Sequence, residues 1–317
     1  MNATPVTHPW VAEGATRVRF GLYGGLLPDW PRGLEWVQLA EELGFDSFWM
    51  ADHPVAHGRD CWTYLAALAT GTSRIRLGSL VSCVSYRATA LLARIVADVD
   101  MISNGRVVLG LGIGDVEREF AQLGLAYPPV RERQAALGEA LEVLPRLLSG
   151  QDVTLAGAHV RVEGAAIRPG PRQQPRVPIL VAGGGEKVTL RQVAQYADAS
   201  NFGPGDTTGN AWTVDDVRRK YEALRGHCEA VGRAYDSVLR TYFGGLLEFG
   251  ESVHTREEQF RTAFGQYLVL HGDPKGAVAH YRALVDAGVR YIIIVGLTDP
   301  EALRLFAEQV VPEVAEA

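Results

Sequence analysis

The sequence predicts an α/β protein, a (β/α)8 TIM barrel with insertions after the helix that follows strand four and after strand seven. Three observations predict this class. Short apolar runs alternate with helical patterns along the whole chain, as parallel strands joined by helical crossovers require. The 317 residues hold eight such strand–helix units. The runner-up, a doubly wound sheet, usually carries G-x-G-x-x-G after its first strand, and GLYGGLLPDW (21–30) does not supply it.

The first four units are regular. Apolar side chains at four positions after the first strand lie roughly on one helical face, and Gly44 ends that helix; the four are Leu34, Val37, Leu39 and Leu43. The same patterns predict strands at 17–23, 45–51, 74–82 and 105–114, followed by helices at 33–45, 61–72, 88–103 and 131–150.

The rhythm breaks at 151–177, where alternating residues predict a hairpin (152–167) and a proline-rich connector follows. Residues 249–273 are long and irregular, so they are a candidate lid over a barrel mouth. We expect one barrel domain over 17–317 after an N-terminal extension (1–16). The last four units have strands at 178–185, 198–204, 237–249 and 289–297, and helices at 186–197, 213–232, 274–288 and 299–314.

Composition limits the function classes. With 47% hydrophobic and 21% charged residues and a net charge of −6, the chain can bury a sizeable core, and it carries no concentrated basic face for nucleic acid. Cys61, Cys83 and Cys228 are too few and too scattered for a disulfide framework. A signal-peptide pattern and an apolar run of membrane-spanning length are both absent, so we expect a cytoplasmic enzyme that does not bind membranes.

In a barrel of this kind, function collects where strands end and lead into the following helices. Polar residues and glycines cluster at these points, and we expect them to converge on one mouth. They are Asp52, His53 and His57 after strand two; Ser82, Cys83, Ser85, Tyr86 and Arg87 after strand three; Gly112, Gly114, Asp115 and Glu117 after strand four; Gly183, Gly184 and Gly185 after strand five; and Asn201 at strand six.

Two glycine-rich stretches are candidates for cofactor binding. The spacing in GLGIG (110–114) does not fit a dinucleotide loop; these glycines either let the strand end turn sharply or keep the backbone thin beside a flat ligand. Gly183, Gly184 and Gly185 lie between a strand and a helix, where free N–H groups favour a phosphate. Lys187 would add charge there, and the alternative is a flexible turn.

The pair Asp52–His53 has three interpretations: metal ligands, an acid/base pair, or a polar turn. Pro54 disfavours a helix at His53, which weakens the spacing of His53 and His57 as metal ligands. No other histidine falls at a strand end, so we predict no metal site. In the acid/base interpretation His53 moves a proton and Asp52 fixes the site beside it.

Five further motifs stand out along the chain. They are GFDSFWMADH (44–53), D-x-x-S-x-G-R (100–106) with GLGIG (110–114), EREFAQLGL (117–125), PILVAGGGEKVTLRQVAQYADASNFG (178–203) and AGVRYIIIVG (287–296). Together they resemble the luciferase-like flavin and deazaflavin oxidoreductases, a barrel family that uses FMN or coenzyme F420. The resemblance runs from about Arg17 to Val314, and the fifth-strand motif is most similar to the F420-dependent branch.

The resemblance implies roles for individual residues. His53 would handle the proton, Asp52 would contact the cofactor ring, and the Leu80–Val81 peptide would be a cis bulge that supports the ring. Asp115 falls where related sugar-phosphate dehydrogenases carry a catalytic glutamate. His57 stands near the place of a tryptophan in some relatives and is our candidate for substrate contact. The implied cofactor contacts are Asp52, Leu80, Val81, Ser82, Gly112, Gly114, Gly183, Gly184, Gly185 and Lys187.

The leading expectation is therefore an F420-dependent oxidoreductase that moves a hydride between the deazaflavin and a small organic substrate. One alternative is an FMN-dependent two-component monooxygenase supplied with reduced flavin by a separate reductase. Another is a non-catalytic barrel that only binds flavin. The resemblance also implies a homodimer.

Overall fold

The computed structural model describes residues 7–14, 16–25, 29–249 and 268–315. Its contacts divide the chain into two compact units. Unit 1 comprises Met1–Trp49 and Ala182–Ala317, and unit 2 comprises Met50–Val181. Most of the predicted lid at 249–273 lies outside the described residues. No helix in the described ranges is both long enough and apolar enough to cross a membrane.

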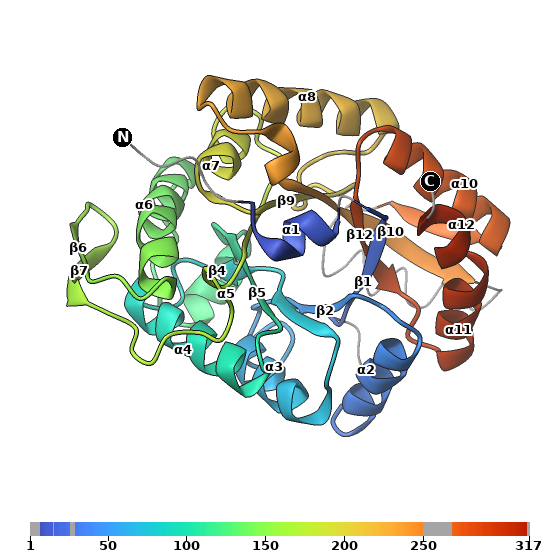
Figure 1. Ribbon diagram of the computed structural model, residues 1–317, viewed down its shortest axis with the longest axis horizontal. Helices are drawn as coiled ribbons and strands as arrows, with labels where there is room; N and C mark the ends of the chain where they lie inside the picture. Colours follow the sequence, from blue (N-terminus) through green and yellow to red (C-terminus); the bar gives the residue numbers. More distant parts are fainter. Residues whose placement is uncertain (1–6, 15, 26–28, 250–267, 316–317) are drawn as a thin grey trace. The chain divides into compact units, whose positions relative to one another are not determined.

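Unit 2 is built on parallel strands in the order β3–β5–β8, and the short strand β4 extends the pairing with β5. Helices α3, α4 and α6 lie side by side (Figure 1). The bounds are α3 Cys61–Gly71, β3 Arg76–Ser79, β4 Ser82–Cys83, α4 Thr89–Ile102, β5 Val107–Gly112, α5 Glu117–Gln122, α6 Val130–Leu148, β6 Val153–Ala156, β7 Arg161–Ala165 and β8 Ile179–Ala182.

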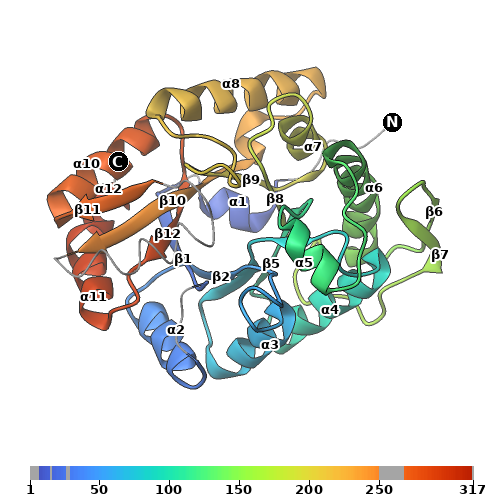
Figure 2. The same cartoon turned by 180° about the vertical axis from the view of Figure 1, so that it is seen from behind.

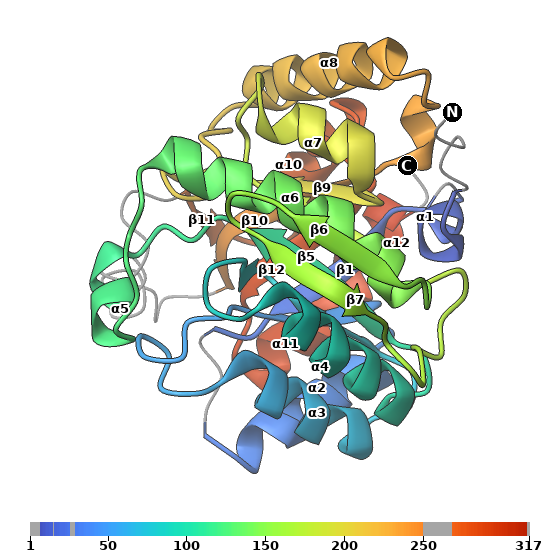
Figure 3. The ribbon, with the colours of Figure 1, turned by 90° about the vertical axis from the view of Figure 1, so that its left-hand side faces the viewer.

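The predicted insertion after the fourth helix is confirmed as an antiparallel hairpin, β6–β7. It lies along α6 and α4 (Figure 3). Its turn is held by Glu139 of α6, whose carboxylate accepts hydrogen bonds from the backbone N–H groups of Ala158, His159 and Val160 at 2.7–3.1 Å. One helical side chain therefore fixes the tip of the insertion.

Unit 1 holds the parallel strands β2–β1–β12–β10, with β9 and β11 also paired to β10. Helices α10, α11 and α12 pack together beside this sheet (Figure 2). The bounds are α1 Pro9–Glu13, β1 Arg19–Tyr23, α2 Arg32–Glu42, β2 Ser47–Met50, α7 Thr189–Tyr196, β9 Ala199–Phe202, α8 Val214–Ala230, η1 Tyr235–Ser237, β10 Leu239–Phe249, β11 Val269–Gly272, α10 Pro274–Asp286, β12 Tyr291–Gly296, α11 Pro300–Gln309 and α12 Val311–Ala315.

The predicted N-terminal extension contains a short helix that the sequence pattern did not reveal. His8 caps α1 through its Nδ1 atom, 3.1 Å from the backbone nitrogen of Trp10. Trp10 is 1% exposed, and its ring centroid lies 6.3 Å from that of Trp49 and 5.9 Å from that of Tyr291. Arg19 also donates to the Trp10 carbonyl at 2.7 Å. Helix α1 thus belongs to the core of unit 1.

Candidate active site

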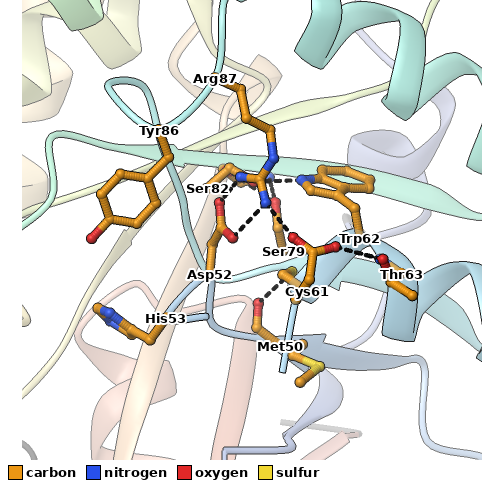
Figure 4. A network of polar contacts seen from close by, with 12 residues as sticks. Met50, Asp52, His53, Cys61, Trp62, Thr63, Ser79, Ser82, Tyr86 and Arg87 are labelled. Carbon is orange, nitrogen blue, oxygen red and sulfur yellow. Dashed lines mark hydrogen bonds and ion pairs between the residues drawn. The ribbon is translucent and has the colours of Figure 1, made fainter. Parts of the chain in front are cut away.

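Asp52 lies two residues after the end of β2 and is bound by Arg87 from the loop between β4 and α4 (Figure 4). The guanidinium group donates to both carboxylate oxygens of Asp52, from Nη1 and, at 3.0 Å, from Nη2. Nη2 also donates to Asp60 at 2.6 Å. Asp52 is 1% exposed, and this burial raises the pKa of its carboxyl group against the opposing charge of Arg87. Asp52 is therefore committed to an internal ion pair.

His53 is paired with Glu119, a residue that no sequence pattern singled out as its partner. Its Nδ1 lies 2.6 Å from Oε2 of Glu119, and the two side chains are 20% and 1% exposed. Oε2 also accepts from the Tyr86 hydroxyl at 3.1 Å. Oε1 accepts from the backbone N–H groups of Val55 and Ala56 at 2.9 and 3.1 Å. Four groups thus contact one buried carboxylate, which joins α5 to the loop after β2.

The pKa values of Glu119 and His53 are shifted in opposite directions. Burial opposes ionisation of Glu119, but the hydrogen bonds from His53 and Ala56 outweigh it and lower the pKa of Glu119 to about 2. Burial likewise disfavours the charged form of His53, yet the hydrogen bond with Glu119 and the charge of Asp115 raise its pKa above the ordinary 6.5. The arrangement therefore favours a protonated imidazole beside an ionised carboxylate.

His57 lies beside His53, with the two ring centroids 5.2 Å apart and the rings edge to face. Its backbone N–H donates to the His53 carbonyl at 2.9 Å. Burial, followed by the charge of His53, lowers the pKa of His57 to about 4. A neutral imidazole is therefore placed next to the His53–Glu119 pair.

Asp115, which the family resemblance made a catalytic candidate, is exposed. Among the described residues it is Glu119, four positions later, that contacts His53. Asp115 acts on His53 only as a nearby charge that raises the imidazole pKa. The signal for Glu119 was an acid within the motif EREFAQLGL, but no spacing rule connects position 119 with position 53.

The segment between β5 and α6 is held in place at both ends by Arg133. Its Nε donates to the Pro128 carbonyl at 2.9 Å and its Nη1 donates to the Gly114 carbonyl. Arg133 also stacks over the ring of Tyr127, which packs against Phe120 with ring centroids 5.0 Å apart. These contacts position α5, and with it Glu119.

The third strand is interrupted by a bulge. The pairing with β5 shifts from Gly78↔Val108 in β3 to Ser82↔Leu111 in β4. The Leu80–Val81 peptide between them is cis, as the resemblance implies. The Ser82 hydroxyl accepts from Nε1 of Trp62 at 3.0 Å and is fully buried (Figure 4).

The glycines of β5 make room for this bulge. A Cβ atom on Gly110 would lie 2.0 Å from the Ser79 carbonyl oxygen, and one on Gly112 would lie 2.6 Å from a methyl group of Val81. Gly114 adopts φ +74°, and its Cβ would meet Cys83 at 2.7 Å. The interpretation that these glycines leave room for a flat ligand is therefore wrong for Gly110. The place where its side chain would stand is occupied by the backbone of the third strand.

In unit 1, Gly183, Gly184 and Gly185 form the loop between β8 and α7, and Gly183 adopts φ +127°. Lys187 is exposed. The cation inside the loop is instead Lys220 of α8, which is 5% exposed and donates from Nζ to the Gly184 carbonyl at 2.7 Å. Burial lowers the pKa of Lys220. The sequence signal was a lysine on the buried face of a helix.

The comparisons with known proteins point in one direction. The family model of luciferase-like monooxygenases matches residues 7–291. An F420-dependent glucose-6-phosphate dehydrogenase of Amycolatopsis mediterranei is 29% identical, over 90% of this chain and 95% of that protein. The protein of the same description from Gordonia bronchialis is 31% identical, over 83% of this chain and 87% of its own length.

Solved structures agree on the fold. The coenzyme F420-dependent tetrahydromethanopterin reductase of Methanopyrus kandleri has a TM-score of 0.77 at 22% identity and covers 94% of this chain and 99% of its own. An F420-dependent secondary alcohol dehydrogenase, with an F420–acetone adduct, has a TM-score of 0.80 at 18% identity and the same coverage of both chains. With the alternating strands and helices of the described residues, this likeness confirms the predicted (β/α)8 barrel, and the doubly wound runner-up is wrong.

Proposed function

Because the chain belongs to the luciferase-like monooxygenase family, we propose that it is an F420-dependent oxidoreductase that moves a hydride between the deazaflavin and a small organic substrate. The names of the relatives support this choice of cofactor, since dehydrogenases and reductases among them are described as F420-dependent. The same cofactor was the leading expectation from the sequence motifs.

Two features of the chain suit such a cofactor. The glycine loop 183–185 at the start of α7, with the buried ammonium group of Lys220 against it, suits a phosphate group. A buried ammonium group needs a negative charge nearby. Oε1 of Glu186 lies 3.8 Å from Nζ of Lys220, but Glu186 is shared with Arg219 and does not compensate Lys220 alone. In unit 2, the bulge at Leu80–Val81 leaves Val81 half-buried, as a side chain that supports a flat ring would be.

The observation that carries the proposal is the hydrogen-bonding state of His53. Nδ1 is bound to Glu119, whereas Nε2 has no hydrogen-bond partner among the residues that the structure describes. The bound deazaflavin supplies a carbon that accepts or donates a hydride. Nε2 of His53 then takes up, or returns, the proton that a substrate hydroxyl exchanges when a C–H bond breaks or forms. His57, neutral at this site, orients the same substrate.

The test is a pair of binding titrations with F420 and with FMN, followed by turnover with a panel of small alcohols and phosphorylated sugars. We expect binding of F420 in preference to FMN. The variant His53→Ala should lower turnover about 10²- to 10⁴-fold with little change in cofactor affinity. The matched control is His159→Ala, at the exposed hairpin turn, and its rate should equal that of the unaltered protein.

The alternatives predict other outcomes. Binding of FMN alone, with oxygen consumption when a reductase is added, would favour the two-component monooxygenase. Cofactor binding without turnover of any substrate would favour the flavin-binding barrel. An unchanged rate in His53→Ala would contradict the role given to His53.

A homodimer is the second part of the proposal. Leu91, Met101 and Ile102 of α4 are 54%, 41% and 52% exposed, so one helix presents three large apolar side chains. A buried interface on α4 would account for them. Sedimentation velocity on the unaltered protein should give a dimer, and Leu91→Lys with Ile102→Lys should give a monomer.

A further inference from the structure

The four hydrogen bonds onto Glu119 define how the two carboxylate oxygens are used. Oε1 is held by two backbone N–H groups, of Val55 and Ala56, which can only donate. Oε2 therefore faces His53 and Tyr86 and cannot exchange places with Oε1 without breaking both bonds. The hydroxyl of Tyr86 is the donor in its contact, because an ionised carboxylate can only accept a hydrogen bond. Burial raises the Tyr86 pKa, so the hydroxyl keeps its proton.

An ionised carboxylate only accepts hydrogen bonds, so a contact of 2.6 Å with Oε2 requires a proton on Nδ1 of His53. In a neutral imidazole that proton leaves Nε2 as the acceptor. We propose that Glu119 is a positioning residue that fixes the Nδ1–H form and the ring orientation of His53, so that Nε2 is the atom that exchanges the substrate proton. This rests on the proposed function and names a residue through which His53 acts.

The surroundings of the pair are consistent with this role. Glu119 is carried by α5, a segment that Arg133 anchors at Gly114 and Pro128, so the carboxylate does not depend on a free loop. The Glu119 side chain is also 1% exposed, so solvent has little access to its oxygens. The other titratable groups that act on the two side chains are Asp52, His57, Tyr86 and Asp115.

The decisive variant is Glu119→Gln. The amide oxygen must stay on the Val55 and Ala56 N–H groups, so the amide N–H₂ faces Nδ1 of His53. Nδ1 then becomes an acceptor and the proton moves to Nε2. The shape of the side chain is preserved, but the atom offered to the substrate is reversed. Glu119→Asp keeps the charge and shortens the reach by one methylene group.

The first measurement does not depend on activity. In protein labelled with 15N-histidine, two-bond 1H–15N correlations distinguish the two neutral forms of an imidazole, and the His53 signal is the one missing from His53→Ala. Above the pKa of His53, where the ring is neutral, we expect Nδ1–H in the unaltered protein and Nε2–H in Glu119→Gln. The control is Glu117→Gln, an exposed acid on the same helix, which should leave the signal unchanged.

The second measurement is the pH profile of turnover with F420. Glu119→Gln should lower kcat at least about 10-fold and move the His53-controlled limb of the profile to lower pH, with the affinity for F420 unchanged. Glu119→Asp should recover part of the rate. Tyr86→Phe, which leaves the carboxylate in place, should change the rate less than Glu119→Gln.

An Nε2–H form in the unaltered protein, or the same form in both proteins, would overturn the role of Glu119. An unchanged pH profile in Glu119→Gln would do so too. If no F420 turnover is found, the proposed function fails, while the imidazole measurement still decides the Glu119 assignment. If Glu119→Gln does not fold, the imidazole measurement is made on Glu119→Asp instead, and His53 should keep its proton on Nδ1 in that variant.

Discussion

Arg87 donates hydrogen bonds from Nη1 and Nη2 to the two oxygens of the buried Asp52 carboxylate. Arg168 binds the Asp152 carboxylate in the same way on the surface of unit 2. The Asp52 side chain is 0% exposed, whereas those of Arg168 and Asp152 are 64% and 67% exposed. The two pairs share their geometry and differ in burial, so they allow the effect of burial to be measured within one protein.

Arg87→Met leaves a charged carboxylate buried without its partner, and we expect it to lower the free energy of unfolding by about 3–5 kcal/mol. Arg168→Met should cause a much smaller change, because water replaces the lost partner. Chemical denaturation followed by circular dichroism measures both. Asp52→Asn combined with Arg87→Met should cost less than the sum of the single changes, since the two groups interact directly. Equal losses for the two arginine variants would contradict this account.

Gly110→Ala tests the close approach of the third strand to β5. Its Cβ would lie 2.0 Å from a backbone oxygen that cannot rotate away, so we expect a loss of about 3 kcal/mol or more. Gly226→Ala is the matched control within α8, where a Cβ meets no atom within 4 Å. That variant should gain about 0.5–1 kcal/mol. Thermal unfolding of the two proteins gives the comparison.

Lys220→Met tests which lysine serves the glycine loop. If Lys220 compensates a cofactor phosphate, its removal should weaken F420 binding about 10-fold, the worth of one charge-assisted hydrogen bond. Lys187→Met, at an exposed position, should change the affinity less. Fluorescence titration with F420 and with its phosphate-free deazaflavin chromophore distinguishes the loss of a phosphate contact from a general disturbance of the folded protein. An equal loss for both ligands would place Lys220 outside the phosphate site.

The free energy of unfolding at acid pH should depend on the ionisation of Glu119. Its pKa of about 2 lies below the ordinary 4.5, so the ionised carboxylate stabilises the folded protein above about pH 4.5, and this is lost as the pH falls toward 2. The loss is of the order of 3 kcal/mol. His53 acts in the opposite direction, because stability from its raised pKa is lost as the pH rises through that value. Denaturation at a series of pH values measures this. As the pH falls below about 4.5, the free energy of unfolding should decrease less in Glu119→Gln than in Glu117→Gln.

The alternation of strands and helices was predictable because each element carries its own periodicity. The hairpin of unit 2 was predictable for the same reason. Helix α1 was not, since five residues are too few to show a period and the partners of Trp10 lie at positions 49 and 291. The split of the third strand into β3 and β4 depends on the contact with Gly110, which spacing along the chain does not reveal.

The candidate site was predicted in part. His53 and Asp52 were selected because they end a buried strand, and that rule holds for any acid or histidine at such a place. Their partners Glu119 and Arg87 stand 66 and 35 positions away, where only the fold brings them into contact. Lys220 was missed because a buried lysine in a helix has no pattern of its own until the loop beside it is known.

The division of the chain has a consequence for biosynthesis. Unit 2 is one continuous stretch, so its strands, helices and the His53–Glu119 pair can assemble as soon as residues 50–181 have left the ribosome. Unit 1 is made of both ends of the chain, and β1 pairs with β12 through Arg19↔Tyr291. Its sheet, and the burial of Trp10 against Tyr291, must wait until β12 has been made. Trp10 and β1 are therefore translated well before the residues that fix their place.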